Sequence, residues 1–190
     1  MIAYLFFCYA LGNILTAWFV GKLYEVDLRQ ERSGNLGARN AGATLGKRAF
    51  FLTFIGDAGK AAIAVMLGFY FGFGAQGAAL GALMVVIGHI FPVILKGRGG
   101  KGVATLIGAT FMLNLPLFGV MAGTFLIAIG LIKSATLSMP IAFLVYILAV
   151  ALTGSLPVLW PVCAAMAIVL IRHKADLQEV FQLRFSGLRK

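Results

Sequence analysis

The segment VATLIGATFMLNLPLFGVMAGTFLIAIGLI, residues 103–132, is apolar along its length apart from an interruption at Asn114-Leu-Pro116. A helix that crosses a bilayer needs about 20 apolar residues, so this segment can cross once, or twice if the chain turns at Asn114. The chain as a whole is 61% hydrophobic and 12% charged, whereas a soluble domain has about 25% charged residues. Similar apolar runs cover residues 1–21, 49–72, 78–95, 139–152 and 156–171. We therefore predict an all-α, polytopic transmembrane helix bundle formed by one domain, residues 1–190.

The basic residues indicate how this bundle is oriented. Lys and Arg accumulate in cytoplasmic loops, and a turn at Asn114 gives about seven membrane segments with every basic loop on one side, the N-terminus outside and the C-terminus in the cytoplasm. A single crossing by residues 103–132 would place the basic tail outside. A five-crossing arrangement would also keep the tail inside, because residues 103–113 form only about 17 Å of helix. This asymmetry accounts for the net charge of +10, and we expect no nucleic-acid partner.

The loop after the third apolar run, Lys96-Gly-Arg-Gly-Gly-Lys-Gly102, is the strongest candidate for a site. It contains the spacing G-x-G-x-x-G, but a dinucleotide fingerprint needs a preceding strand and a later acid, and a Walker loop needs Lys where Val103 stands. Free glycine amides and a helix that starts at Gly102 nonetheless suit an anion, whereas a purely topogenic role for the cations is the alternative. The expected phosphate ligands are the side chains of Lys96, Arg98 and Lys101 and the backbone N–H groups of Gly99, Gly100 and Lys101.

Other polar groups are expected on the same side of the membrane. The loop Ser33-Gly-Asn-Leu-Gly-Ala-Arg-Asn40 offers groups that suit a phosphate or glycerol hydroxyls, unless it is simply a solvated turn. Asp57 and Lys60 lie three residues apart on one apolar helix, so we expect them to pair and face the bundle interior, as support for a site or as a structural pair. His89 fits a buried donor as well as a ligand-binding group. Arg172-His173 closes the last run, as an interfacial anchor or as part of the site.

These segments together resemble the bacterial acyl-phosphate:glycerol-3-phosphate acyltransferases, the PlsY family. Ser33–Asn40 with Leu45-Gly-Lys47 resembles the first family motif, and Gly88-His-Ile-Phe-Pro92 with Lys96–Thr105 resembles the second. Arg172-His-Lys174 resembles the third motif, and Asp57 with Lys60 resembles the family's D-x-x-K. The resemblance implies an enzyme of the bacterial plasma membrane with its active site on the cytoplasmic face. Such an enzyme moves a fatty acyl group from acyl phosphate to the 1-hydroxyl of sn-glycerol 3-phosphate, giving lysophosphatidic acid and inorganic phosphate.

The resemblance also implies which residues act and which partners they meet. It implies no cofactor and no metal, a surrounding of membrane lipids, and contact with the soluble enzyme that produces the acyl phosphate. The proton of the attacking hydroxyl goes either to His173 or to the substrate's own phosphate, and both alternatives stay open. The implied catalytic residues are His173, Lys101 and Arg98. The implied substrate-binding residues are Ser33, Gly34, Asn35, Arg39, Asn40, Lys47, Asp57, Lys60, His89, Lys96, Gly99, Gly100, Ser138, Arg172 and Asp176.

Several positions depart from the family pattern. The family usually has Arg where Ala43 stands, and we expect Arg39 to take over the missing phosphate contact. The third motif commonly has Asn where Asp176 stands, and an acid beside a phosphate is unfavourable unless it is paired. The stretch Gly12-Asn-Ile-Leu-Thr16 lacks the proline usual in the first span.

Two other classes of membrane protein fit the sequence less well. A phosphate transporter would show repeated halves or broken helices near the middle of the membrane, whereas these motifs cluster at one face without a repeat. A membrane scaffold would have no need of glycines and cations in three separate loops.

Overall fold

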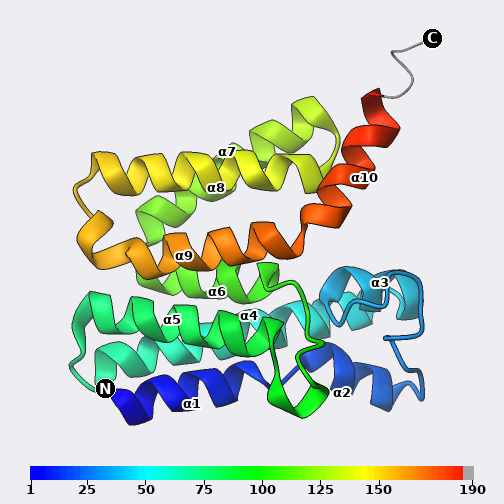
Figure 1. Cartoon of the computed structure of the whole chain (residues 1–190), viewed down its shortest axis with the longest axis horizontal. Helices are drawn as coiled ribbons and strands as arrows, with labels where there is room; N and C mark the ends of the chain where they lie inside the picture. The colour runs from blue at the N-terminus through cyan, green and yellow to red at the C-terminus, as the bar shows by residue number, and fades with distance from the viewer. Residues whose placement is uncertain (186–190) are drawn as a thin grey trace.

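The structure is a computed structural model that describes residues 1–185 and leaves out the last five residues of the basic tail. The chain forms ten α-helices there, most of them running side by side along one direction (Figure 1). The helices are α1 (Ile2–Gly12), α2 (Thr16–Leu23), α3 (Ala38–Leu45), α4 (Lys47–Tyr70), α5 (Gly74–Ile90), α6 (Val103–Leu113), α7 (Leu115–Ile132), α8 (Ala135–Leu152), α9 (Leu156–Arg172) and α10 (Lys174–Phe185). A single 3-10 turn covers Val93–Leu95.

Most of every apolar run of the sequence is α-helical, which confirms the all-α membrane fold. Five helical segments are long and apolar enough to cross a membrane, and α9 with α10, bent by 57°, gives a sixth. The apolar helix α6 has 11 residues. The number of complete crossings and the sides on which the termini lie stay predictions.

The chain turns at Asn114, as the interruption in the long apolar run predicted. The Asn114 side chain accepts a hydrogen bond of 3.0 Å from the Leu117 N–H and so caps the start of α7. Asn is among the side chains preferred at this position, because its oxygen satisfies a free helical N–H. Residues 103–132 therefore form two helices, α6 and α7, rather than one long crossing.

The basic loops gather at one end of the bundle, which we call the basic end (Figure 1). It holds residues 24–46, the glycine loop at 91–102, the α7–α8 turn at Lys133, and α10. The turns at the opposite end, residues 71–73, Asn114 and 153–155, contain no charged residue. The predicted separation of charge between the two ends is therefore present in the folded chain.

Three local features differ from a simple reading of the apolar runs as unbroken helices. The first span counts as one candidate crossing over Ile2–Leu23, but it contains a break, because α1 ends at Gly12 and α2 begins at Thr16. The polar segment 22–48 between the first two apolar runs, expected to be a loop, contains a helix of its own, α3. The third run stops being α-helical at Ile90 rather than continuing to residue 95, since Pro92 lacks the N–H that an α-helix would need there.

Close contacts between glycines bring the first and third spans together. A Cβ added at Gly12 would overlap the backbone of Val85 and Gly88, and one added at Gly88 would overlap the backbone of Tyr9 and Gly12. Helices in membranes pack most closely where such small residues meet. This contact holds the break in the first span against the end of α5, where the glycine loop begins.

Candidate active site

The glycine loop folds back onto the end of α5. The Gly99 N–H donates to the Ile90 carbonyl at 3.3 Å, and the Gly100 N–H donates to the His89 carbonyl at 3.1 Å. Both amides are therefore engaged within the protein in this structure, and their predicted contact with a phosphate stays a prediction. Gly97 and Arg98 likewise donate to carbonyls of Pro92 and Leu95.

The amides that remain available lie one step further along the chain. Within the described residues, the N–H groups of Lys101, Gly102 and Val103 donate to no protein acceptor, and α6 begins at Val103. Gly102 has a φ of +83°, which places it in the left-handed region that glycine adopts without strain. A helix N-terminus with free amides favours an anion, so the expected anion position moves from Gly99-Gly100 to the start of α6.

The loop glycines serve a packing role instead. A Cβ on Gly100 would overlap Nε2 of His89 and lie 2.7 Å from the Leu36 carbonyl oxygen. A Cβ on Gly99 would overlap the His89 carbonyl oxygen. The glycine loop therefore lies directly on His89 and touches the loop Ser33–Asn40 at Leu36. A larger residue at Gly99 or Gly100 would push these segments apart.

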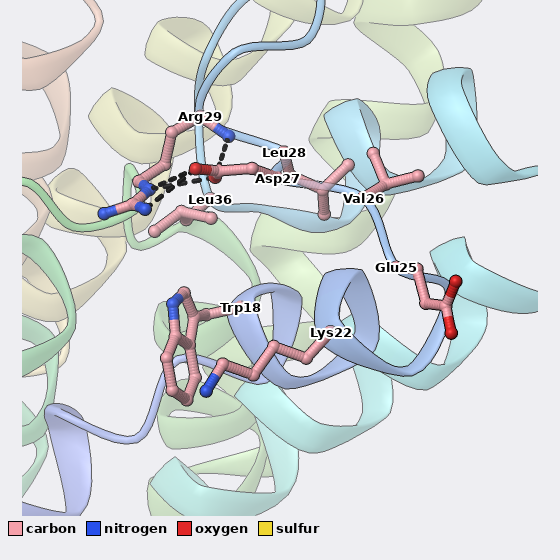
Figure 2. A pocket seen from close by; sticks show the side chains of 8 residues that line it. All are labelled: Trp18, Lys22, Glu25, Val26, Asp27, Leu28, Arg29 and Leu36. Atoms are coloured by element: carbon pink, nitrogen blue, oxygen red, sulfur yellow. Dashed lines mark hydrogen bonds and ion pairs between the residues drawn. The ribbon is translucent and has the colours of Figure 1, made fainter.

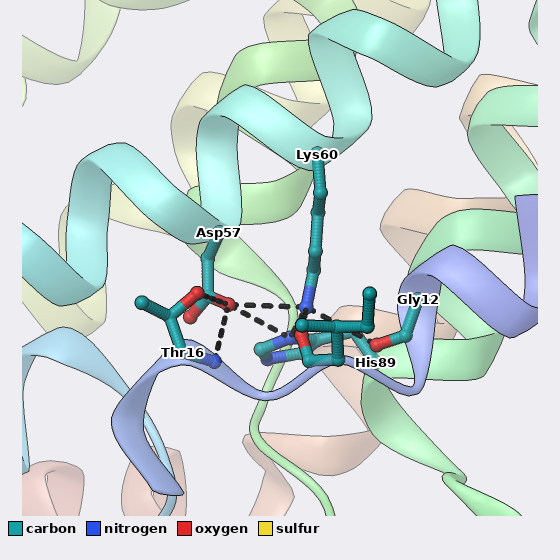
Figure 3. A network of polar contacts seen from close by, with 6 residues as sticks. Gly12, Thr16, Asp57, Lys60 and His89 are labelled. Carbon is teal, nitrogen blue, oxygen red and sulfur yellow. Dashed lines mark hydrogen bonds and ion pairs between the residues drawn. The ribbon is translucent and has the colours of Figure 1, made fainter. Parts of the chain in front are cut away.

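His89 belongs to a buried polar network with Asp57 and Lys60 (Figure 3). Lys60 Nζ lies 3.0 Å from Asp57 Oδ1 and 3.0 Å from His89 Nδ1. Asp57 is 1% exposed, Lys60 is 5% exposed and His89 is 2% exposed. The structure thus confirms the predicted pair and its inward orientation, and it places His89 directly against Gly99 and Gly100 of the glycine loop.

The same network closes the break in the first span. Lys60 Nζ donates to the Gly12 carbonyl at 3.1 Å and to the Ile14 carbonyl at 2.5 Å. Asp57 Oδ1 accepts from the Thr16 hydroxyl at 3.1 Å and from the Thr16 N–H at 3.4 Å. Backbone groups that lose their helical partners within a membrane need others, and here one ion pair supplies them.

Lys101 lies next to the start of α6, close enough to His173 for its charge to act on the ring. Lys101 Nζ forms an ion pair with Asp176 Oδ2 in the first turn of α10. His173 Nδ1 lies 2.8 Å from the Val169 carbonyl oxygen. A carbonyl can only accept, so Nδ1 carries a proton and Nε2 of the neutral ring is left as an acceptor.

The surroundings of His173 keep that ring neutral. Burial lowers the pKa of His173, and the positive charge of Lys101 acts in the same direction, whereas the bond to the Val169 carbonyl and the charge of Asp176 oppose the shift. Since the ordinary pKa is about 6.5, the ring is uncharged at pH 7. An uncharged imidazole with a free Nε2 can accept a proton.

The first loop is held together by Asn40. Its side-chain amide donates to the Leu28 carbonyl at 2.9 Å, and its Oδ1 accepts from the Ser33 N–H at 3.4 Å. Gly34 takes a φ of +65°, and its N–H donates to the Glu31 carbonyl. Asn40 is buried, so the structure assigns it to shaping the loop, while the Ser33 side chain stays exposed.

Arg39 reaches from α3 toward the start of α8. Its Nη1 lies 3.4 Å from the Thr136 hydroxyl, and the residue is otherwise exposed. Ser138, on the same turn of α8, is buried and donates its hydroxyl to the Ser134 carbonyl at 2.8 Å. Arg39 is therefore available to an anion at the basic end, whereas the Ser138 hydroxyl already has a partner.

The remaining predicted site residues lie at the basic end and make few contacts with the rest of the site. Lys47, Lys96 and Arg98 are exposed, and their side chains make no polar contact within residues 1–184. The Arg172 guanidinium lies over the ring of Phe91, 5.7 Å from its centroid. Asn35 stays at the turn of the first loop, where its carbonyl accepts from the Gly37 N–H.

A cavity of about 280 Å³ opens beside α2 and the polar loop (Figure 2). Lys22 Nζ lies 3.9 Å from the centroid of the Trp18 ring, and Arg29 forms an ion pair of 2.8 Å with Asp27. Hydrogen bonds from Arg29 lower the pKa of Asp27 to about 2. The cavity is lined by Trp18, Lys22, Glu25, Val26, Asp27, Leu28, Arg29 and Leu36, none of them a predicted site residue.

Among the described residues, no three His, Cys, Asp or Glu side chains lie close enough together to bind a metal.

Sequence reasoning missed two partners of the site. Thr16 binds Asp57, and Thr136 contacts Arg39. A buried carboxylate needs donors, so Asp57 signalled that a partner existed. Nothing in the sequence pattern indicated that the partner would come from the first span.

Comparison with known proteins connects this geometry to one family. A family model described as glycerol-3-phosphate acyltransferase matches residues 2–183. The chain is 38% identical over 178 residues to glycerol-3-phosphate acyltransferase 1 of Bacillus cereus (strain ATCC 10987 / NRS 248), covering 90% of this chain and 93% of that protein. It is 34% identical over 173 residues to glycerol-3-phosphate acyltransferase 3 of Bacillus anthracis, covering 90% and 87% of the two chains.

Solved structures show the same architecture. The glycerol 3-phosphate form of PlsY (YgiH), an integral membrane glycerol 3-phosphate acyltransferase, superposes with a TM-score of 0.88 at 27% identity, covering 100% of this chain and 98% of that one. The lysophosphatidic acid form superposes with a TM-score of 0.84 at 27% identity, covering 96% and 92%.

Proposed function

Since this chain belongs to the glycerol-3-phosphate acyltransferase family, we propose that it transfers a fatty acyl group from acyl phosphate to the 1-hydroxyl of sn-glycerol 3-phosphate. The products are lysophosphatidic acid and inorganic phosphate. The solved relatives are described in a glycerol 3-phosphate form and a lysophosphatidic acid form, which correspond to the acceptor and the product of this transfer. The reaction takes place at the basic end, which we assign to the cytoplasmic face of a bacterial plasma membrane.

The observation that carries this proposal is the start of α6. Free amides at Lys101–Val103, the Lys101 ammonium and the neutral ring of His173 come together there. This combination suits a reaction in which both substrates carry phosphate and a hydroxyl must lose a proton. We assign the phosphate of the donor to the α6 amides and Lys101, with Arg98 as a further neutralising charge.

The chemistry requires little more than positioning. The 1-hydroxyl oxygen attacks the acyl carbon and forms the ester C–O bond. The bond between that carbon and the phosphate oxygen breaks, and phosphate leaves with the electron pair. Because an acyl phosphate is already activated, holding the two anions together supplies much of the acceleration. Donors aimed at the developing negative charge supply the rest.

The acceptor substrate is assigned to the first loop and Arg39. The Ser33 hydroxyl and the Arg39 guanidinium are exposed at the basic end and can bind phosphate or glycerol oxygens. In this arrangement Asp57, Lys60 and His89 act through the loops that they hold rather than by touching substrate. Arg39 stands in for the family arginine that Ala43 replaces.

The hydroxyl proton has two acceptors that meet the chemical requirement. One is Nε2 of His173, and the other is the substrate's phosphate, whose second pKa is about 6. A His173→Ala variant separates them. A roughly thousandfold loss of kcat identifies His173 as the base, and retention of most of the kcat identifies the substrate phosphate.

The decisive experiment is a test of the donor. Purified protein is mixed with glycerol 3-phosphate and either palmitoyl phosphate or palmitoyl-CoA. We expect lysophosphatidic acid and inorganic phosphate to appear in equal amounts with palmitoyl phosphate and no product with palmitoyl-CoA. Product from palmitoyl-CoA alone would overturn the proposed donor while leaving the acceptor in place.

The soluble enzyme that makes the donor is proposed to deliver it at the basic end. Acyl phosphate is an amphiphile with an anionic head, so a cationic membrane face suits its capture. Pull-down of that enzyme by the intact membrane protein, weakened by high salt, is the expected result. Binding that ignores salt would contradict an electrostatic contact.

A further inference from the structure

The ion pair between Lys101 and Asp176 stands at the position where a substrate phosphate is expected. Lys101 is the cation adjacent to the free amides of α6, and its ammonium is already bound by the Asp176 carboxylate. The side chains are 25% and 34% exposed, so solvent and ligands can reach both. Within the described residues, Asp176 has no other hydrogen-bonding or ionic partner.

A carboxylate and a phosphate oxygen are equivalent partners for an ammonium. Both are anionic oxygen acceptors that form charge-assisted hydrogen bonds with Lys, and both are favoured beside a helix N-terminus. When a phosphate binds Lys101, the carboxylate must leave or stay as a second negative charge a few ångströms from the ligand. Either outcome weakens phosphate binding, because like charges at such distances repel.

The local structure permits Asp176 to leave. It lies in the first turn of α10, which departs from α9 at a bend of 57° next to His173. Most of α10 is exposed, including the neighbouring Glu179. Release of Asp176 therefore breaks one partly exposed contact and disturbs none of the buried core clusters.

We propose that Asp176 is a specificity-determining residue whose carboxylate occupies the phosphate position at Lys101 in the empty site and so sets the affinity for a phosphorylated substrate. This inference rests on the proposed function, which places a substrate phosphate at Lys101. The ligand chemistry is a phosphate monoanion or dianion, which the proposed function assigns at Lys101 to acyl phosphate. A change in the affinity for glycerol 3-phosphate instead would place the acceptor's phosphate at Lys101.

The test removes the charge of Asp176 and keeps its shape. In Asp176→Asn we expect the KM for acyl phosphate, and the inhibition constant for inorganic phosphate, to fall about two- to fivefold, the range for loss of a partly exposed ion pair. Glu179→Gln removes a charge from the same helix at an exposed position that has no hydrogen-bonding or ionic partner among residues 1–185, and it should change neither constant.

Binding without turnover separates this inference from the proposed donor. Thermal stabilisation of the protein by glycerol 3-phosphate or inorganic phosphate gives a Kd that needs no acyl donor, so an error in the donor would not affect it. A lower Kd for phosphate in Asp176→Asn than in the parent supports the inference. Unchanged or weaker phosphate binding in Asp176→Asn overturns it, as does an equal gain in Glu179→Gln, which would reduce the effect to net charge.

Discussion

Removal of Asp57 tests whether the buried network holds the site together. In an Asp57→Ala variant the Lys60 ammonium, 5% exposed, loses a carboxylate 3.0 Å away and keeps only carbonyl groups and His89 as partners. Breaking a buried ion pair by removing one partner typically costs about 3–5 kcal/mol, because the other charge is left uncompensated. We expect a loss of that size in the free energy of unfolding.

The assay is reversible unfolding of the purified protein in mixed detergent micelles, followed by circular dichroism. Thr53→Val provides a matched control on the same helix, because the buried Thr53 hydroxyl has no hydrogen-bond partner in the part of the chain that the structure describes, and its removal should be close to neutral. A Lys60→Met variant and the double variant complete a cycle. Since Asp57 and Lys60 compensate one another, the double variant should lose less than the sum of the two single losses, by about 1–3 kcal/mol.

Two results would refute this reasoning. A loss below about 1 kcal/mol in Asp57→Ala would mean that the pair contributes no more than a surface ion pair. Strict additivity in the cycle would mean that the two charges do not sense one another. Activity adds a separate readout, because a displaced His89 should disturb the glycine loop above it and lower kcat/KM in protein that remains folded.

Three further results are expected. Arg39→Ala should raise the KM for glycerol 3-phosphate about tenfold or more, the range for loss of a hydrogen bond to a charged group, and an unchanged KM would rule out the assigned phosphate contact. Burial lowers the pKa of His173 below its unfolded value of about 6.5, so protonation of this ring opposes folding. As the pH drops from about 7 to 5, the thermal stability of the parent should therefore fall more steeply than that of His173→Asn. Equal pH slopes in the two proteins would contradict this. Gly100→Ala should destabilise the protein and reduce activity because its Cβ would overlap His89, whereas Gly59→Ala, which meets nothing within 4 Å, should be tolerated; equal effects in the two would argue against tight packing of the loop.

The helical segments and the interior ion pair could be predicted because they depend on local features. Each apolar run is long enough to form a helix, and an asparagine that can cap a helix marks the turn at Asn114. Asp57 and Lys60 are three residues apart on one helix, so their pairing needs no knowledge of the rest of the fold. The start of α6 at Val103 likewise follows from glycine in the left-handed region at Gly102.

The acceptors of the glycine-loop N–H groups could not be predicted from the sequence, because they depend on tertiary contacts. Glycine density indicates that the backbone can approach something closely, but it does not say whether that partner is a ligand or the protein. Here the partners of Gly99 and Gly100 are the carbonyls of Ile90 and His89, which become available only because α5 ends before Pro92. The amides left for an anion are those of the following three residues.

The break in the first span was equally hidden from sequence patterns. Residues 1–21 read as one apolar segment, and no proline marks an interruption. The two carbonyls that the break releases are bound by Lys60, more than 40 positions further along the chain. A rule based on local periodicity cannot include a partner at that separation.

The contact between Lys60 and the broken first span also has a consequence for how the chain assembles in the membrane. Alone in a bilayer, the first segment would expose unpaired carbonyls to hydrocarbon, and α4 would carry a cation and an anion into it; each is unfavourable there. Together they satisfy one another, so we expect the first segment to reach its final depth only after α4 has been synthesised. We expect the first segment of a Lys60→Met chain to remain open to protease during biogenesis, whereas full protection would argue against such dependence. The ammonium of Lys60, which lies on α4, therefore supplies the hydrogen bonds that water would otherwise donate to the free carbonyls of the first span.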